Sequence, residues 1–308
     1  MDDVTPHRDD TLSQEAWRDN LREIGAREGF YEELGEEHTA LFLRRGRTLM
    51  VTFENLDHIY AREDDRMPWG HGFVQSHGWS MLGLMAHGWT WYRDDAVFDF
   101  FDRLRDQGFF DGFDKVVFYG ASMGAYAACV FSSAAPGATV IAISPQATLD
   151  REIAPWEKRY HRVWRRSFSG RYGYAPDLVR TAESLYLFYD PRSDPDAMHA
   201  ALFRGDNIRR LRCRFMGHRI ASQWMQLGLL KPVVAACVDG DLTAARFYRM
   251  MRARRESPKY QKEILNVLKS LQRPQLLIGY CDAVLARRRA PHFRNARRAA
   301  REALKQKG

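Results

Sequence analysis

The sequence lacks the long hydrophobic runs and the clustered cysteines that several classes of protein require. No apolar run among its 308 residues reaches the about 18 residues that a membrane-spanning helix needs. The cysteines are widely spaced, and they form neither the CxxC pairs nor the Cys/His clusters typical of zinc sites. We therefore expect no membrane span, no structural zinc and no disulfide framework, and we expect free thiols in a reducing compartment. The cysteines are Cys129, Cys213, Cys237 and Cys281.

Recognisable cofactor sites are also missing. No GxGxxG follows an expected strand, and no GxxxxGK[ST] occurs, so the phosphate-binding loops that these patterns form are not predicted. Residues 69–91 are rich in Gly, His and Trp, but His71, His77 and His87 match no metal-ligand spacing, and packing is the better interpretation. The first ten residues are acidic and polar, unlike a secretory signal. These features predict a cytoplasmic protein with neither metal nor other cofactor.

The net charge of +8 is unevenly distributed. Residues 1–64 contain 8 basic and 16 acidic side chains, residues 65–240 contain 21 and 18, and residues 241–308 contain 18 and 5. A basic end could bind nucleic acid, anionic lipid or an acidic partner. It has no nucleic-acid motif and little aromatic interleaving, which argues against nucleic acid. It could equally meet the acidic N-terminal segment, within one molecule or between two in an oligomer.

Strand and helix patterns alternate over about residues 38–232. The apolar runs and period-two patterns predict strands at 38–43, 47–53, 80–85, 115–120, 138–144, 184–190 and 209–215, with the first two forming a hairpin around Gly46 and the last near a sheet edge. Three- and four-residue spacings predict helices at 12–36, 94–107, 123–134 and 195–203, and then at 243–255, 258–271 and 275–288.

The predicted fold class is therefore α/β, with a mainly parallel sheet flanked by helices and an all-helical basic C-terminal extension. We expect an N-terminal helical segment at 1–37, a central domain at 38–240 with an insert at 151–180, and the extension at 241–308.

One segment, KVVFYGASMGAYAACVF, combines an apolar strand, the sequence Gly-Ala-Ser-Met-Gly and a helix rich in small residues. A G-x-S-x-G pattern is weak alone, but it is much stronger at a strand-to-helix turn. Gly120 and Gly124 remove the Cβ atoms that would clash in a tight turn, which would present Ser122 at the carboxyl edge of the sheet. The backbone N–H of Met123, at the start of the helix, would be free to stabilise an oxyanion.

At this motif the chain resembles the α/β-hydrolase family, over roughly residues 38–232. The resemblance implies a Ser-His-Asp triad in the chain order nucleophile, acid, histidine, with each residue on a loop after a strand. His218, three residues after the last apolar residue of the expected last strand, then fits the general base.

The resemblance places the triad acid on the loop after the expected strand 184–190. Asp190, Asp194 and Asp196 all remain candidates there, and Asp194 is equally explained as an N-cap before Pro195. A second oxyanion donor should follow the strand 47–53, at the backbone N–H of Glu54 or Asn55. The sequence lacks the HGGG-type loop of many lipases, which argues against that kind of enzyme.

Residues 151–180 lie where the family commonly inserts a cap. The insert contains eight Arg or Lys and three Asp or Glu, interleaved with aromatic residues. If it covers Ser122, it favours an anionic or carbohydrate-like substrate; otherwise it is a solvated helix with an aromatic core face. The predicted function is a serine hydrolase acting on a small-molecule or saccharide-linked acyl ester. An acyltransferase with the same triad and a non-catalytic hydrolase-like scaffold are the alternatives.

Overall fold

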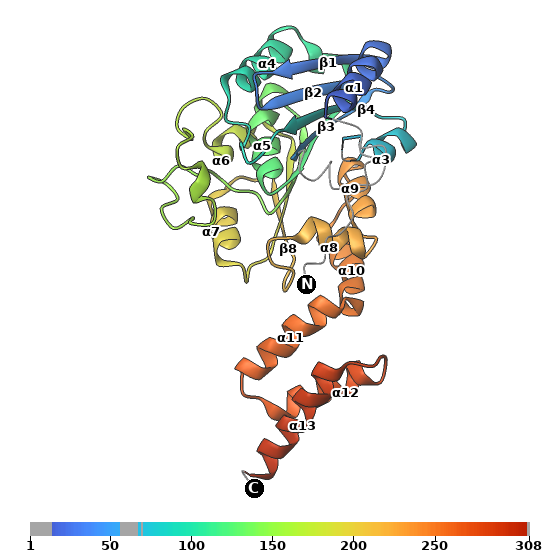
Figure 1. Ribbon diagram of the computed structural model, residues 1–308, viewed down its shortest axis with the longest axis vertical. Coiled ribbons are helices and arrows are strands. Elements are labelled where there is room, and N and C mark those ends of the chain that lie inside the picture. The colour runs from blue at the N-terminus through green and yellow to red at the C-terminus, as the bar shows by residue number, and fades with distance from the viewer. Residues whose placement is uncertain (1–13, 56–66, 69, 307–308) are drawn as a thin grey trace, which may run out of the picture. The chain divides into compact units, whose positions relative to one another are not determined.

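The structure is a computed structural model, and it describes residues 14–55, 67–68 and 70–306. The chain divides into two compact units (Figure 1). The first comprises Met1–Tyr189 and Asp194–Leu211, and the second comprises Asp190–Ser193 and Arg212–Gly308. No helix in the described ranges is both long and apolar enough to cross a membrane.

The first unit is built on a mixed sheet that is mainly parallel. Among the described residues it has eight strands, in the order β1-β2-β4-β3-β5-β6-β7-β8. Strands β1, β2 and β4 pair antiparallel, while β4, β3, β5, β6 and β7 pair in parallel. The strands are β1 (Gly29–Leu34), β2 (His38–Leu43), β3 (Thr48–Asn55), β4 (Ser80–Ala86), β5 (Lys115–Ala121), β6 (Thr139–Ile143), β7 (Ser184–Tyr189) and β8 (Ile208–Arg212).

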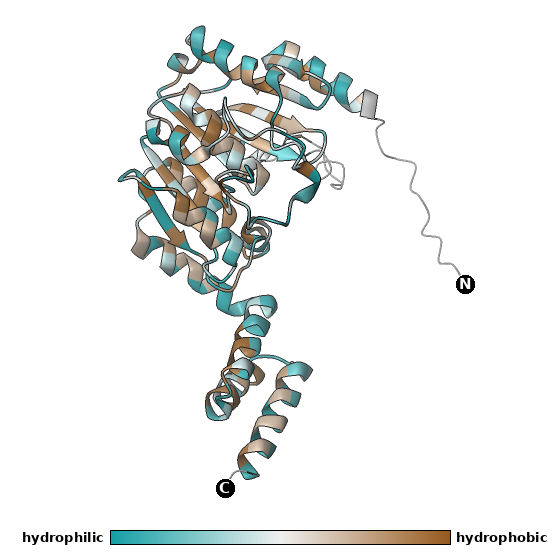
Figure 2. Cartoon of the chain, turned by 90° about the vertical axis from the view of Figure 1, so that its left-hand side faces the viewer, coloured by the Kyte–Doolittle hydropathy of each residue, from teal (hydrophilic) through white to brown (hydrophobic). Residues whose placement is uncertain are grey.

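Helices pack on both faces of this sheet. Because side chains alternate along a strand, Leu41 and Leu43 of β2 pack with Trp17 of the first helix, while Phe42 joins the large core on the opposite face. Figure 2 shows hydrophobic residues both in the strands and in the helices. The helices of this unit are α1 (Gln14–Glu28), α3 (His71–Ser76), α4 (Asp95–Asp106), α5 (Met123–Phe131), α6 (Ala175–Leu178) and α7 (Asp194–Leu202), with 3₁₀ turns at Phe109–Gly112, Ser132–Ala134, His161–Val163 and Val179–Thr181.

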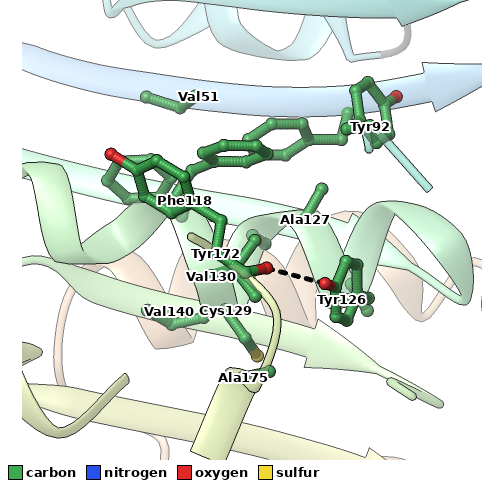
Figure 3. Close-up of a cluster of buried hydrophobic side chains, with 14 of the residues drawn as sticks. Val51, Tyr92, Phe118, Tyr126, Ala127, Cys129, Val130, Val140, Tyr172 and Ala175 are labelled. Atoms are coloured by element: carbon green, nitrogen blue, oxygen red, sulfur yellow. Dashed lines mark hydrogen bonds between the residues drawn. The ribbon is translucent and has the colours of Figure 1, made fainter. Parts of the chain in front are cut away.

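Helix α5 lies in the centre of the core (Figure 3). All nine of its residues are buried, in keeping with its small and apolar sequence. The Tyr126 hydroxyl donates a hydrogen bond to the carbonyl oxygen of Tyr172 at 2.7 Å, which ties the insert to α5. A helix buried on every side is held rigidly, so the residue that precedes it is held in place as well.

The second unit is helical. Leu265, Leu277, Cys281 and Phe293 belong to a small core formed by its last three helices. The four cysteines of the chain are all buried free thiols. The helices are α8 (Ile220–Gln226), α9 (Leu230–Val238), α10 (Ala244–Met250), α11 (Pro258–Ser270), α12 (Pro274–Leu285) and α13 (Pro291–Lys305), with a 3₁₀ turn at Met251–Glu256.

The predicted fold class is confirmed, and the structure corrects three of its elements. The helix expected at 12–36 ends at Glu28, because residues 29–34 form β1, which pairs with β2. The hairpin expected around Gly46 is wrong, because β4 lies between β2 and β3. The actual hairpin joins β1 and β2 at Gly35, whose φ of 63° suits glycine. The expected strand 209–215 ends at Arg212.

Candidate active site

Ser122 stands at a sharp turn between β5 and α5. Its backbone has φ 53° and ψ −118°, a conformation that non-glycine residues rarely adopt. Its N–H donates to the carbonyl oxygen of Ile143 on β6 at 2.8 Å, and its own carbonyl oxygen accepts from Ala125 at 2.9 Å and Tyr126 at 3.0 Å. The strained turn is thus fixed by the neighbouring strand on one side and by the first turn of α5 on the other.

The two glycines of the motif are required by close backbone approach. A Cβ on Gly120 would overlap the carbonyl oxygen of Gly124. A Cβ on Gly124 would lie 2.5 Å from the carbonyl oxygen of Phe53, on β3. Any larger residue at either position would therefore displace backbone, which explains the spacing of the motif in physical terms.

The hydroxyl of Ser122 is hydrogen-bonded to the hydroxyl of Tyr160, a residue of the insert. Burial raises the pKa of Tyr160, so its hydroxyl is neutral at physiological pH and can donate a hydrogen bond. Ser122 is itself half-buried. The insert therefore reaches the hydroxyl that the motif presents.

Two further residues of the first unit hold Tyr160 in place. The ring of Trp91 packs edge-on against Tyr160, with a centroid distance of 4.7 Å. Trp91 Nε1 donates to Gln146 Oε1 at 3.0 Å, and Gln146 Nε2 donates to the Tyr160 hydroxyl at 3.5 Å. Ser122, Tyr160, Gln146 and Trp91 thus form one continuous chain of hydrogen bonds.

A buried ionic network anchors the residues just before Tyr160. Arg159 donates from Nε and Nη2 to the carboxylate of Glu157, and from Nη1 to Asp196 Oδ1 at 2.8 Å. Glu157 Oε2 also lies 3.1 Å from His199 Nε2. Both carboxylates and His199 are at most 2% exposed. The network therefore ties this irregular insert to α7.

The protonation states in this network follow from the hydrogen bonds. The backbone N–H of Ala147 donates to His199 Nδ1 at 3.2 Å, so the proton of the neutral ring lies on Nε2 and faces Glu157. Burial lowers the pKa of His199, which keeps the ring neutral. Burial alone would raise the pKa of Glu157, but hydrogen bonds from His199 and Arg159 lower it to about 2.

Asp190 and His218 both belong to the second unit. Asp190 directly follows β7 and is 2% exposed. Its Oδ1 accepts from the N–H of Arg192 at 2.9 Å, and its Oδ2 accepts from the N–H of Gly217 at 2.7 Å. The carboxylate thereby holds the loop that carries His218, and both side chains line one pocket of about 360 Å³.

The other two candidate acids occupy different surroundings. Asp194 is the exposed first residue of α7. Asp196 is buried and bound by Arg159. Of the three aspartates, Asp190 is the one that shares a unit and a pocket with His218.

The positions expected for oxyanion donors lie beside the turn. Met123 begins α5, and the N–H of the first residue of a helix has no partner within the helix. Phe53 of β3 is paired with Gly120 of β5, so Asn55, two residues further along β3, is level with Ser122. The carbonyl oxygen of Glu54 accepts from the Tyr92 hydroxyl at 2.8 Å. Residues 56–66, which follow Asn55, lie outside the described residues.

Several of the insert's arginines are already neutralised within the first unit. Arg159 is bound as described, Arg166 pairs with Glu37, and Arg171 pairs with Asp99 and Asp102. These residues therefore contribute less to an anionic substrate site than the composition of the insert implies. Within the described ranges, no three His, Cys, Asp or Glu side chains gather as metal ligands.

Sequence reasoning did not identify Tyr160, Trp91, Gln146 or the network around Glu157. The aromatic and basic composition of the insert marked it for attention, but it has no period that predicts which side chain faces Ser122. Trp91 and Gln146 carry no local motif. Only their places, Trp91 beyond the end of β4 and Gln146 directly after β6, could have marked them.

No protein-family model matches the sequence, and no curated protein matches it. Among solved structures, the chain is similar to a capsule O-acetyltransferase of Neisseria meningitidis serogroup A, with a TM-score of 0.45 and 11% identity over 67% of this chain and 93% of that one. It is also similar to an esterase of Pyrobaculum calidifontis, with a TM-score of 0.44 and 14% identity over 77% and 95% of the two chains. An esterase of Pyrococcus furiosus gives a TM-score of 0.43 and 15% identity over 66% and 87%.

Similarities of this strength do not assign the activities of those proteins to this chain. The architecture itself is evident in the mainly parallel sheet, the helices on its two faces and the sharp turn at Ser122 between β5 and α5. The chain has an α/β-hydrolase-like fold.

Proposed function

We propose that this chain is a serine enzyme that transfers an acyl group from an ester. Ser122 is the nucleophile, His218 is the general base, and Asp190 orients the imidazole and stabilises its charged form. The N–H of Met123 and a donor at Asn55 stabilise the oxyanion. The substrate is a small-molecule or saccharide-linked acyl ester.

The observation that carries this proposal is the backbone of Ser122. Holding a serine at φ 53°, between glycines that tolerate no Cβ, costs conformational free energy. Such strain is found mainly at functional sites, which supports a functional role for the hydroxyl that this turn presents. Such a turn exposes the nucleophile and places the N–H of the next residue beside it, which is the arrangement that acyl transfer requires.

The proposed reaction has two halves. Ser122 Oγ bonds to the acyl carbon, its proton passes to His218, and the carbonyl electron pair moves onto the oxygen to form the oxyanion. The oxyanion then collapses, the bond to the leaving alkoxide breaks, and that alkoxide takes the proton from His218. In the second half, water or an acceptor hydroxyl attacks the acyl-enzyme with the same proton transfers in reverse.

Asp190 is the preferred acid for reasons of placement. A triad acid must reach the imidazole, and Asp190 lines the same pocket as His218. Asp196 is neutralised by Arg159 and belongs to the other unit. Asp194 is exposed at the start of α7, where a carboxylate is favoured by the helix dipole without any catalytic role.

A direct test uses p-nitrophenyl acetate as the probe ester. The wild type is expected to release p-nitrophenol faster than Ser122→Ala, with the two proteins matched in thermal unfolding. Added glycerol distinguishes hydrolysis from acyl transfer in the second half of the reaction, because glyceryl acetate forms only if a hydroxyl acceptor competes with water. A wild type that is folded and no faster than Ser122→Ala would instead favour the non-catalytic scaffold.

A further inference from the structure

The pocket that contains His218 has a second feature, which is an excess of basic side chains. It lies entirely within the second unit. The charged or titratable residues that line it are Asp190, Arg192, His218, Arg219, Lys259 and Glu263. Three of these carry a permanent positive charge, and they approach the pocket from three separate segments of the chain.

The three cations are not neutralised by neighbouring carboxylates. In the part of the chain that the structure describes, Arg192, Arg219 and Lys259 make no ion pair. The Arg192 guanidinium lies over the ring of Phe215, 5.0 Å from its centroid. This contrasts with Arg159, Arg166 and Arg171 of the insert, which are bound to acidic side chains.

The two acids of the pocket do not cancel this charge. Asp190 is buried, and its two oxygens accept the backbone N–H of Arg192 and that of Gly217, which directly precedes His218. Glu263 is exposed, and it lies one helical turn beyond Lys259 on α11. A ligand in the pocket therefore faces three exposed cationic groups and one exposed carboxylate.

Packing within the second unit fixes the start of α11 beside the His218 loop. The rings of Phe215 and Tyr260 meet edge-on, with a centroid distance of 5.9 Å. The guanidinium of Arg254 lies over the ring of Tyr260, 5.2 Å from its centroid. Because Lys259 directly precedes Tyr260, this contact brings a lysine of the C-terminal extension into the pocket. The extension thus supplies part of the lining of this pocket.

We propose that this pocket binds an anionic group, a carboxylate, sulfate or phosphate, on the ester that the chain acts on. Arg219 and Lys259 are the residues that bind it, with Arg192 beside them. Guanidinium and ammonium groups donate charge-assisted hydrogen bonds to such oxygens. His218, the proposed general base, lines the same pocket. This inference rests on the proposed function and names the substrate class for it.

Two pairs of probe esters test the proposal and locate the anion. p-Nitrophenyl hemisuccinate and p-nitrophenyl butyrate differ by a carboxylate on the acyl side, and 4-acetoxybenzoate and 4-acetoxybenzamide differ by one on the leaving side. At low ionic strength the wild type is expected to prefer the anionic member of one pair by about tenfold in kcat/KM. Lys259→Met and Arg219→Gln should each reduce that ratio about threefold, and added salt should reduce it too.

The matched control is Lys262→Met, which removes an exposed lysine of the same helix that does not line the pocket. It should leave the ratio unchanged. The proposal is overturned if neither anionic ester is preferred, or if the preference survives in both pocket variants. The neutral esters report on the proposed function separately, because their hydrolysis needs Ser122 but no anion site.

A binding readout keeps the pocket testable without turnover. Inorganic phosphate should raise the Tm of the wild type more than sodium chloride of equal ionic strength does. The Lys259→Met/Arg219→Gln variant should lose this difference, whereas Lys262→Met should keep it. Equal effects of phosphate and chloride on the wild type would contradict the pocket even if the ester reaction is confirmed.

Discussion

The hydroxyl of Ser122 and the hydroxyl of Tyr160 are hydrogen-bonded to each other. One is held by a strained turn of the sheet, and the other is held in the insert by Trp91 and Gln146. When an acyl group is bonded to Ser122, Oγ and the other oxygens of the tetrahedral intermediate share one carbon, and they lie closer together than the length of a hydrogen bond. A hydroxyl that reaches Ser122 Oγ therefore also reaches the oxygens of an acyl group bonded to it.

Tyr160→Phe is consequently expected to slow acyl transfer by about tenfold to a hundredfold, because a donor near the reacting oxygens is lost. The measurement is kcat for p-nitrophenyl acetate. Tyr172→Phe is the control, since it removes a hydroxyl of the same insert that donates to Asp102 instead. A Tyr160→Phe enzyme as fast as the wild type would show that the contact is incidental, and a faster one would show that Tyr160 restrains Ser122.

Substitution of Asp190 and of Asp194 should separate these two candidate acids by activity. Asp190→Asn is expected to reduce kcat by about a hundredfold to ten-thousandfold, because the imidazole loses its orienting carboxylate. Asp194→Asn should remain within about twofold of the wild type, because Asp194 is exposed. Unfolding by urea must accompany the kinetics, since Asp190 also accepts two backbone N–H groups. A larger loss in Asp194→Asn would reverse the assignment.

The network around Glu157 predicts a pH-dependent stability. The pKa of Glu157 is lowered to about 2 from 4.5, so its contribution is complete above about pH 4.5 and is lost as the pH falls towards 2. Glu157→Gln should reduce the free energy of unfolding by about 3 kcal/mol at pH 7. The difference from the wild type should shrink between pH 5 and pH 3.

Glu152→Gln supplies the comparison, because Glu152 is an exposed acid of the same insert. It is expected to change the free energy of unfolding by less than about 0.5 kcal/mol. The network account would be wrong if the gap between wild type and Glu157→Gln stayed constant as the pH was lowered.

The glycines of the turn should be far less tolerant than a glycine in an open position. Gly124→Ala places a methyl group 2.5 Å from the carbonyl oxygen of Phe53, and it should cost about 1–3 kcal/mol of stability. Gly279, within α12, has no atom within 4 Å of its missing Cβ, and Gly279→Ala should stabilise by about 0.5–1 kcal/mol. We expect the urea midpoint of Gly124→Ala to lie below that of the wild type and the midpoint of Gly279→Ala to lie above it.

Local features of the site could be predicted from the sequence because their causes are local. The turn at Ser122 depends on glycines two residues away on either side, and the apolar run before it marks β5. The acid and the histidine follow strands with clear patterns. By contrast, residues 29–34 contain helix-forming glutamates, and they form β1 because Phe30 and Tyr31 pair with Phe42 and Leu41 of β2. Such pairing between strands overrides local propensity.

The residues missed by sequence reasoning are those placed by distant contacts. Tyr160 lies in an insert without regular period, and its position depends on Arg159, Asp196 and His199, which are brought together only in the folded chain. The pocket cation Lys259 belongs to the basic C-terminal extension, for which the sequence predicts helices and an excess of positive charge but no binding site. Its place beside His218 depends on the contact of Tyr260 with Phe215, which no spacing in the sequence reveals.

The central claim is that Ser122 is an activated nucleophile, and covalent labelling tests it most directly. The wild type is incubated with a fluorophosphonate, and the modified residue is located by mass spectrometry of the digested protein. The account predicts one adduct, on Ser122, that is absent from Ser122→Ala and forms much more slowly in His218→Asn. A folded wild type that gains no adduct across pH 6 to 9, or gains it on another residue, would contradict the claim.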